Sequence, residues 1–522
     1  MKRLPIGIQT FSKIIEENCY YVDKTHFALK LIQNGGYYFL SRPRRFGKSL
    51  FLDTLAEIFL GNKELFKGLY IYDKYDFKPH PVIRISFGSG DYSLDESQTI
   101  DEIKHILQDN IEALGLDCTD INDFKTCFKE LIRKSYQKHK TRVVILIDEY
   151  DKPILDNITN KEMATKARNI LKNFYSIIKD NDRYIRFVFI TGVSKFSKLN
   201  LFSGLNNLED ITINKEYAEI CGYTHDDLLT VFKDRIEGAN LELVKKWYNG
   251  YNYFGKPLYN PFDILLFLSS GHDFRNYWWQ TGNPSFLIEK LKEENYYIPE
   301  LENALISEEA LEAFDVEYID LRALLWQTGY LTFEERFTDE RGRLKYKLKI
   351  PNLEIQYSLN ELFILYLTNQ RQEMYRYEDN LYEALKQNDF TSFTNHLKTI
   401  FSTIPYTNYA NNIISKYEGY YSSVVFTYLM ALGYDVIPED ITNKGRIDLT
   451  IKTKDKILII EFKVDQEKDK PIKQIKERRY YEKYLKENKD IYLVGMVFDS
   501  KERNIESWRV EEVNKDGANK LH

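Results

Sequence analysis

Tyr37-Tyr38-Phe39-Leu40 runs directly into Ser41-Arg42-Pro43-Arg44-Arg45-Phe46-Gly47-Lys48-Ser49, and Leu50-Phe51-Leu52-Asp53-Thr54-Leu55 comes next. The first run is short and apolar, which predicts a buried strand, and the last run begins a segment with helical periodicity. A loop between a strand and the N-terminus of a helix points successive backbone N–H groups at a bound phosphate. This stretch therefore predicts a phosphate-binding site at the start of an α/β domain.

The loop holds the side chains that a P-loop needs. Lys48 would contact the β- and γ-phosphates of ATP, and the Ser49 hydroxyl would ligate Mg²⁺. Arg42 stands where the usual pattern has its first glycine, so the loop is expected to bend differently there. We expect the nucleotide to be bound by the whole loop, namely Arg42, Pro43, Arg44, Arg45, Phe46, Gly47, Lys48 and Ser49.

Two further apolar runs end in polar residues suited to the same site. The run from 142 to 147 ends in Asp148 and Glu149. We assign Asp148 to the metal through water, and Glu149 to activation of the attacking water as a catalytic residue. Thr191 and Ser194 follow the run from 187 to 190, and they are either sensors of the γ-phosphate or ordinary turn residues.

The order of the elements predicts the fold class, α/β. Apolar runs at 37–40, 82–87, 143–147, 187–190 and 211–213 alternate with helical segments at 49–59, 100–114 and 162–178, which predicts a parallel sheet covered on both faces. Residues from 223 to about 400 read as mostly helical and rich in aromatics, as in a lid and a winged-helix-like region. We expect domains at 1–222, 223–400 and 401–522.

The last domain has a different order of elements. From about residue 406 we expect a helix at 417–432, strands at 446–452 and 457–464 joined by a tight turn, a helix at 472–486 and a strand at 492–498. This order predicts a small mixed sheet with helices packed on it. Fifteen Lys and Arg face ten Asp and Glu between residues 441 and 490, a local net charge of +5 within a chain of net charge −6. Phosphate contacts are best sought there, although a solvated helix face has the same charge.

Asp448 and the run Glu461-Phe462-Lys463 lie in the two strands of the expected hairpin. Alternation along a strand places Glu461 and Lys463 on one face, with Asp448 facing them from the neighbouring strand. Two converging carboxylates can hold Mg²⁺, and Lys463 would stabilise the developing charge on a phosphate. We therefore expect Asp448, Glu461 and Lys463 to form a catalytic metal site, whereas the alternative is a surface ion pair.

Several runs together resemble a known family. Tyr21-Val22-Asp23-Lys24-Thr25, the loop from Ser41 to Ser49, Ile147-Asp148-Glu149-Tyr150-Asp151 and Gly204-Leu205-Asn206-Asn207-Leu208 resemble the AAA-ATPase-like family that is often fused to a PD-(D/E)XK nuclease domain. The resemblance covers about residues 4–215 and 410–505. It implies an arginine-bearing loop as the usual form, Glu418 as a further metal ligand, and Gln474 as a supporting residue near the catalytic lysine.

The composition limits the class of protein. Its apolar runs are all shorter than the roughly 20 residues that cross a bilayer. Cys19, Cys118, Cys127 and Cys221 lack the spacing of a zinc site or of a disulfide framework, so we expect reduced thiols and a cytoplasmic location.

These features favour one function over two others. We expect an ATPase coupled to a Mg²⁺-dependent nuclease whose cleavage is regulated by nucleotide state, with ATP and Mg²⁺ as cofactors. The expected partner is nucleic acid, DNA in preference to RNA, with no membrane, and homo-oligomerisation stays open. The alternative is a signalling or assembly ATPase whose C-terminal module binds nucleic acid without cutting it. A helicase-like motor is disfavoured because the sequence has no recognisable second motor core.

Overall fold

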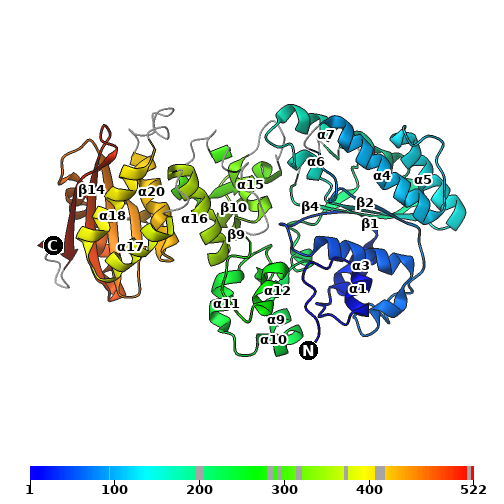
Figure 1. Ribbon diagram of the computed structural model, residues 1–522, viewed down its shortest axis with the longest axis horizontal. Coiled ribbons are helices and arrows are strands. Elements are labelled where there is room, and N and C mark those ends of the chain that lie inside the picture. The colour runs from blue at the N-terminus through cyan, green and yellow to red at the C-terminus, as the bar shows by residue number, and fades with distance from the viewer. Residues whose placement is uncertain are drawn as a thin grey trace. The chain divides into compact units, whose positions relative to one another are not determined.

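The computed structural model describes residues 1–92, 95–195, 201–202, 205–278, 287, 290–291, 297–301, 304–312, 320–368, 374–405, 418–513 and 519–521. Gly204 of one expected motif and the expected start of the last domain, residues 406–417, lie outside these ranges. The chain divides into two compact units (Figure 1). The first unit comprises residues 1–277 and 305–352, and the second comprises residues 278–304 and 353–522.

The first unit is built on a five-stranded parallel sheet with the order β2-β3-β4-β1-β5. The strands are β1 Gly36–Ser41, β2 Val82–Ser86, β3 Val143–Asp148, β4 Ile185–Gly192 and β5 Leu208–Asp210. Figure 1 shows helices on both faces of this sheet, which explains why β1, β3 and β4 are nearly continuous apolar runs. The expected parallel sheet is confirmed, but its last strand ends at Asp210, just before the predicted run at 211–213.

The helices around this sheet begin at polar capping residues. Asp95, Asp123 and Asn160 accept hydrogen bonds from backbone N–H groups in the first turns of α4, α5 and α7. α5 was not predicted from the sequence. The helices are α1 Phe11–Glu16, α2 Thr25–Asn34, α3 Lys48–Leu60, α4 Glu96–Leu114, α5 Phe124–His139, α6 Lys152–Leu155 and α7 Lys161–Asp180, with 3-10 turns η1 Lys63–Phe66, η2 Asp182–Tyr184 and η3 Lys215–Tyr217.

In the rest of the first unit, smaller elements between residues 223 and 277 pack around an aromatic core that includes Tyr20, Tyr248, Phe267 and Tyr277, and further small elements lie at residues 305–349. The helices are α9 His225–Val231, α10 Lys233–Ile236, α11 Leu241–Tyr248, α12 Pro261–Ser269, α14 Glu308–Glu312 and α15 Leu321–Thr328. The strands are β6 Tyr223–Thr224 and β7 Leu258–Tyr259, which pair with each other, and the antiparallel sheet of β8 Leu305–Ser307, β10 Leu344–Lys349 and β9 Thr332–Thr338. The expected helical middle is confirmed, with this small sheet in addition.

The second unit has a mixed sheet in the order β11-β12-β13-β14-β15-β16. Only the pair β13 and β14 is parallel among the described strands of this sheet. The strands are β11 Asp435–Thr442, β12 Gly445–Lys452, β13 Lys456–Val464, β14 Asp490–Asp499, β15 Asn504–Val513 and β16 Asn519–Leu521. The helices are α16 Leu353–Thr368, α17 Met374–Lys386, α18 Phe390–Thr403, α20 Glu418–Ala431 and α21 Lys470–Glu477, with 3-10 turns η5 Ile298–Leu301 and η7 Tyr480–Glu487. The expected mixed sheet is confirmed.

One expected helix is broken. The helix predicted at 472–486 is α21 followed by η7, because Arg479 between them adopts a left-handed φ of 49° that a continuous helix cannot contain.

Among the described residues, the helices are all too short or too polar to cross a bilayer.

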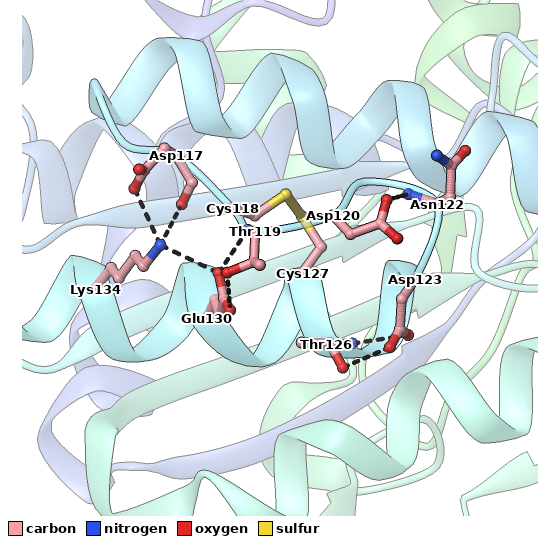
Figure 2. The surroundings of a disulfide bond; sticks show 10 residues. All are labelled: Asp117, Cys118, Thr119, Asp120, Asn122, Asp123, Thr126, Cys127, Glu130 and Lys134. Atoms are coloured by element: carbon pink, nitrogen blue, oxygen red, sulfur yellow. Dashed lines mark hydrogen bonds and ion pairs between the residues drawn. A yellow bond between two sulfur atoms is a disulfide. The ribbon is translucent and has the colours of Figure 1, made fainter.

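A disulfide joins Cys118 and Cys127, which corrects the expectation that all four cysteines are reduced (Figure 2). Cys118 lies in the loop after α4, and Cys127 is buried in the first turn of α5. Thr119 donates two hydrogen bonds to Glu130 on α5, which holds the loop against the helix. This brings the two Cα atoms to 5.2 Å, within the range that a disulfide spans. The pairing depends on how α5 folds back on the loop, which the cysteine spacing does not reveal.

We predict that protein purified without reductant and then denatured reacts with iodoacetamide at two cysteines. These would be Cys19 and Cys221, which are free and buried in the folded chain. After reduction, mass spectrometry should find all four cysteines alkylated. Four alkylated cysteines without prior reduction would contradict the disulfide.

Candidate functional site

The loop between β1 and α3 has the backbone of a phosphate-binding turn. Gly47, directly before the first helical residue Lys48, has a φ of 92°, and Arg45 has a φ of 61°. Only glycine adopts the first of these values without strain. Left-handed residues in a loop that enters a helix allow backbone N–H groups to face an anion at the helix N-terminus. The loop is therefore shaped to receive an anion.

Lys48 lies inside this turn. Its ammonium group donates to the carbonyl oxygens of Arg42 at 2.9 Å and Pro43 at 2.8 Å. Burial lowers the pKa of Lys48, and the charge of Asp148 opposes this shift. An anion held by the loop would give this buried cation a partner of opposite charge. The position of Lys48 therefore fits a contact with phosphate oxygens.

The end of β3 brings two carboxylates to the same edge of the sheet. Burial raises the pKa of Asp148, whereas a hydrogen bond from Ser49 and the charge of Lys48 lower it. Glu149 is left-handed, with a φ of 49°, and burial and the neighbouring Asp148 raise its pKa. The fold thus brings Lys48, Ser49, Asp148 and Glu149 together although β4 separates β1 from β3 in the sheet.

Arg42 is buried and faces away from the anion site. Its guanidinium donates to the carbonyl oxygens of Thr212 at 2.7 Å and Tyr217 at 3.3 Å, and it lies 3.7 Å from the centre of the Tyr253 ring. These contacts tie the start of the loop to the segment after β5 and to Tyr253. The side chain of Arg42 therefore does not reach a phosphate, and it could contribute to the loop only through its backbone.

The other loop side chains also point in different directions. Phe46 is fully buried and packs edge-on against Tyr251 at 5.1 Å between ring centres. Arg45 stacks on Phe262, with its guanidinium 3.9 Å from the ring centre. Arg44 is exposed. The loop is thus anchored by Arg42, Arg45 and Phe46, and only Arg44 among its arginines keeps an exposed, unstacked guanidinium among the described contacts.

The residues after β4 are held by Asp151, which the sequence analysis did not assign to the site. Its carboxylate accepts hydrogen bonds from the backbone N–H groups of Ser194 at 2.6 Å and Val193 at 3.1 Å, and also from the Ser194 hydroxyl. The Tyr150 hydroxyl adds a bond to the Ser194 carbonyl at 3.0 Å. These hydrogen bonds hold Ser194, which follows β4, against the segment that follows β3. The run from Ile147 to Asp151 entered the sequence analysis only through the family resemblance, which gave Asp151 no role.

Thr191 differs from Ser194. It is fully buried, and its hydroxyl has no hydrogen-bond partner among the described residues. It lies beside Leu40 of β1, at the strand end that leads into the loop. A buried hydroxyl without a partner has an unmet need that a ligand oxygen could satisfy.

A small cavity of about 60 Å³ opens beside Gly47 and the first turn of α3. Its walls are mainly aromatic and aliphatic and include Tyr21, Val22, Leu50 and Phe51. The Tyr21-Val22 run was noticed only through the family resemblance, since an apolar pair far from the loop in sequence gives no local sign of a ligand.

The second candidate site lies where β12 and β13 part. Their last ladder pair is Leu449 with Ile460, so Asp448 and Glu461 come next in the same register. The ladder does not continue. Instead, the Asp448 carboxylate accepts the backbone N–H of Phe462 at 2.7 Å. The expected hairpin thereby brings its two carboxylates together at the end of the pairing.

Glu461 has no exposed side-chain surface. One carboxylate oxygen accepts a hydrogen bond from the Gln474 amide at 2.7 Å, and the other is buried without a hydrogen-bond partner among the described residues. Burial and the charge of Asp448 raise the pKa of Glu461, whereas the charge of Lys463 lowers it. A buried oxygen without a donor beside a second carboxylate fits a cation.

Lys463 lies between two carboxylates. Its ammonium group donates to Glu418 at 3.2 Å and lies 3.6 Å from Glu461. Burial raises the pKa of Glu418, and the charge of Lys463 lowers it. Glu418, Asp448, Glu461, Lys463 and Gln474, all expected from the sequence, are thus brought to one place.

Glu439 lies opposite Asp448 in the β11–β12 register and was not expected from the sequence. Its φ of 51° is unusual for a non-glycine residue within a strand. Glu439 forms an ion pair with Arg446 and accepts a hydrogen bond from the Tyr297 hydroxyl at 3.2 Å. Because β11 was not predicted, its acidic residues were not considered. Within the described residues, no three Asp, Glu, His or Cys side chains complete a metal site alone, so water or phosphate oxygens would have to join Asp448 and Glu461.

Comparison with known proteins matches both parts of the chain. Residues 5–202 match the family model described as predicted AAA-ATPase, and residues 416–508 match that of the PD-(D/E)XK nuclease superfamily. The chain is also 45% identical over 515 residues to an uncharacterized protein in the vnfD 5′ region of Azotobacter chroococcum mcd 1, covering 98% of this chain and 99% of that protein.

We predict that Arg42→Ala destabilises the first unit by about 3 kcal/mol, because it removes a buried cation and leaves backbone carbonyls without donors. In differential scanning calorimetry, the transition of this unit should move to a lower temperature. Arg44→Ala, which removes an exposed arginine from the same loop, serves as the control and should melt like the wild type. Equal melting of all three proteins would contradict the anchoring role of Arg42.

Proposed function

Because the chain belongs to the predicted AAA-ATPase family, in a form that continues into a PD-(D/E)XK nuclease-superfamily domain, we propose that it hydrolyses ATP in its first unit and cleaves nucleic acid in its second. The observation that carries the proposal is Glu461, a buried carboxylate with one unpartnered oxygen beside Asp448 and Lys463. A structural ion pair would not need such an oxygen.

In the first unit, the loop would hold the phosphates of ATP through its backbone N–H groups and Lys48. Ser49 and Asp148 are suited to hold the Mg²⁺ that accompanies ATP, Ser49 directly and Asp148 through water. Glu149 would accept the proton of the attacking water, a role that its raised pKa favours. The hydroxyl of Thr191 would contact the γ-phosphate, while Ser194 would hold its loop in place.

The aromatic cavity beside Gly47 is the place we propose for the base. It adjoins the N-terminus of α3, where the phosphates would lie, and its walls are apolar, as a stacked base requires. At about 60 Å³ the cavity is smaller than a purine base, so residues 20–24 and 220–223, which line it, would have to move apart for the base to enter.

In the second unit, Asp448 and Glu461 would hold Mg²⁺ together with water or phosphate oxygens. Glu418, whose carboxylate accepts a hydrogen bond from Lys463, could join them as a further ligand only if its side chain moved. The metal, when bound, supplies a Lewis acid that polarises the phosphate and lowers the pKa of bound water. Lys463 would neutralise charge that develops on the phosphate, and Gln474 would orient the Glu461 carboxylate. The first substrate to test is DNA.

We also propose that the nucleotide state regulates cleavage. Support comes from the residues after β4 that Asp151 holds. The backbone N–H of Lys195, the next residue along, donates to Gln327 on α15 at 3.0 Å. Lys195 also forms a buried ion pair with Asp210 at 3.0 Å. A shift of Thr191 and Ser194 on ATP hydrolysis would therefore also displace α15, which lies outside the nucleotide site.

For the first unit, we predict that Lys48→Ala loses ATP binding, because it removes the cation that faces the phosphates. Glu149→Gln should bind ATP but lose hydrolysis, since an amide cannot accept the proton. Isothermal titration calorimetry and a phosphate-release assay measure the two effects, with the exposed Lys67→Ala as the control. ATP affinity unchanged in Lys48→Ala would refute the phosphate-binding assignment.

For the second unit, we predict that Asp448→Asn, Glu461→Gln and Lys463→Ala each reduce Mg²⁺-dependent DNA cleavage roughly a hundredfold or more. The first two should also weaken Mg²⁺ binding because they remove a ligand charge, whereas Lys463→Ala should not. Cleavage would be followed on plasmid, linear and single-stranded DNA with ATP, with ADP and without nucleotide.

The exposed Glu502→Gln is the matched control, and ATP hydrolysis should remain near the wild-type rate in all four variants. If the wild type binds DNA but does not cut it, the C-terminal module is a binding domain. If the three variants cut as well as the wild type, the metal site is assigned to the wrong residues.

A further inference from the structure

The helix α21 presents three different faces. Ile472 and Ile475 are buried against the sheet. Gly495 on β14 allows this close approach, because a Cβ there would lie 2.8 Å from a side-chain carbon of Ile472. On a second face, Lys476 forms an ion pair with Glu511 at 2.8 Å, and the Glu511 side chain is only 3% exposed. These two faces fix the helix in place.

The third face is polar and lines a cavity of about 610 Å³. Lys470, Lys473, Gln474 and Glu477 follow the i, i+3, i+4, i+7 spacing of one helix face. Arg478 joins them, and its guanidinium is positioned by a hydrogen bond to the Lys444 carbonyl at 2.8 Å. Two carboxylates, Glu467 and Glu477, also line the cavity, so three cations leave it with a small positive excess. We call this cavity the α21 groove.

The α21 groove adjoins the candidate metal site through Gln474. The amide of Gln474 lines the groove and donates to Glu461 at 2.7 Å. Gln474 also hydrogen-bonds the Tyr480 hydroxyl, and the nearly buried Tyr480 forms part of the groove wall. A Cβ on Gly445 would lie 2.8 Å from this hydroxyl, so the glycine leaves room for it. Gln474 and Tyr480 therefore form part of the groove wall and also hold the Glu461 carboxylate, Gln474 directly and Tyr480 through Gln474.

We propose that the α21 groove binds the phosphodiester backbone of the nucleic-acid strand next to the cleaved phosphate, with Lys470, Lys473 and Arg478 contacting its phosphates. This inference rests on the proposed nuclease function. Cations along a groove that leads to a metal site would guide the strand so that one phosphate reaches Asp448 and Glu461. Lys476, which is next to the groove residue Glu477 in the chain, is excluded from this role by its ion pair with the buried Glu511.

The test compares two full-length variants with the same change in net charge. The groove variant is Lys470→Gln, Lys473→Gln and Arg478→Gln, and the control variant is Lys454→Gln, Lys486→Gln and Lys501→Gln, three exposed lysines that are not among the groove residues. Fluorescence anisotropy with labelled single-stranded and duplex DNA, in EDTA to prevent cleavage, gives affinity over a range of salt concentrations. Differential scanning calorimetry of the second unit, which holds all six substituted residues, checks that each variant is folded.

The groove variant should bind DNA roughly tenfold or more weakly, and the magnitude of its salt slope should fall by about two to three, as three lost phosphate contacts imply. The control variant should keep most of the wild-type affinity. Equal affinity and slope in the two variants, with a wild type that binds and cuts DNA, would overturn the groove assignment alone. A wild type that neither binds nor cuts nucleic acid would overturn the nuclease proposal and the groove with it.

Discussion

The second unit is organised around one costly group, the buried carboxylate of Glu461. Burying a charged carboxylate costs several kcal/mol unless donors or cations compensate for it. Gln474 from α21 and Lys463 from the same strand supply part of that compensation, while Asp448 adds a like charge. The end of the β12–β13 ladder and the position of α21 are thus linked to a single side chain. Apolar residues at these positions would be expected to make the unit more stable. A buried carboxylate beside a second carboxylate is therefore typical of a functional site.

In the first unit, the sequence predicted the elements that carry local signals. Periodicity and the residue types in adjacent positions were enough to predict the strand, loop and helix around Lys48. The same signals predicted the carboxylates after β3 and the parallel sheet. The anchoring of the loop did not follow. Arg42 contacts Thr212, Tyr217 and Tyr253, which are far from it in the chain, and no local pattern records such contacts. The same holds for Asp151, whose role depends on β4 lying beside β3.

In the second unit, spacing within one hairpin was enough to predict that Asp448, Glu461 and Lys463 would meet. β11 was missed because Pro438 and acidic residues interrupt its apolar pattern, and Glu439 was missed with it. Lys473 and Lys476 looked equivalent as charges in a basic stretch. In the structure they differ, because Lys476 faces Glu511 on β15 whereas Lys473 faces the groove. Which side of the helix faces the groove cannot be predicted without knowing how the helix lies on the sheet.

The two compact units are interlaced along the chain. The first unit takes residues 1–277 and 305–352, and the segment between them belongs to the second unit. Neither unit can be released by a single cut: a fragment starting at residue 353 would lack Tyr297, which supports Glu439, and one ending at residue 202 would lack Tyr253 and Gln327. The ranges that match the two families are therefore shorter than the compact units that contain them. Such an order along the chain makes exchange of one half for another by a single recombination unfavourable, so we expect the two units to be inherited together.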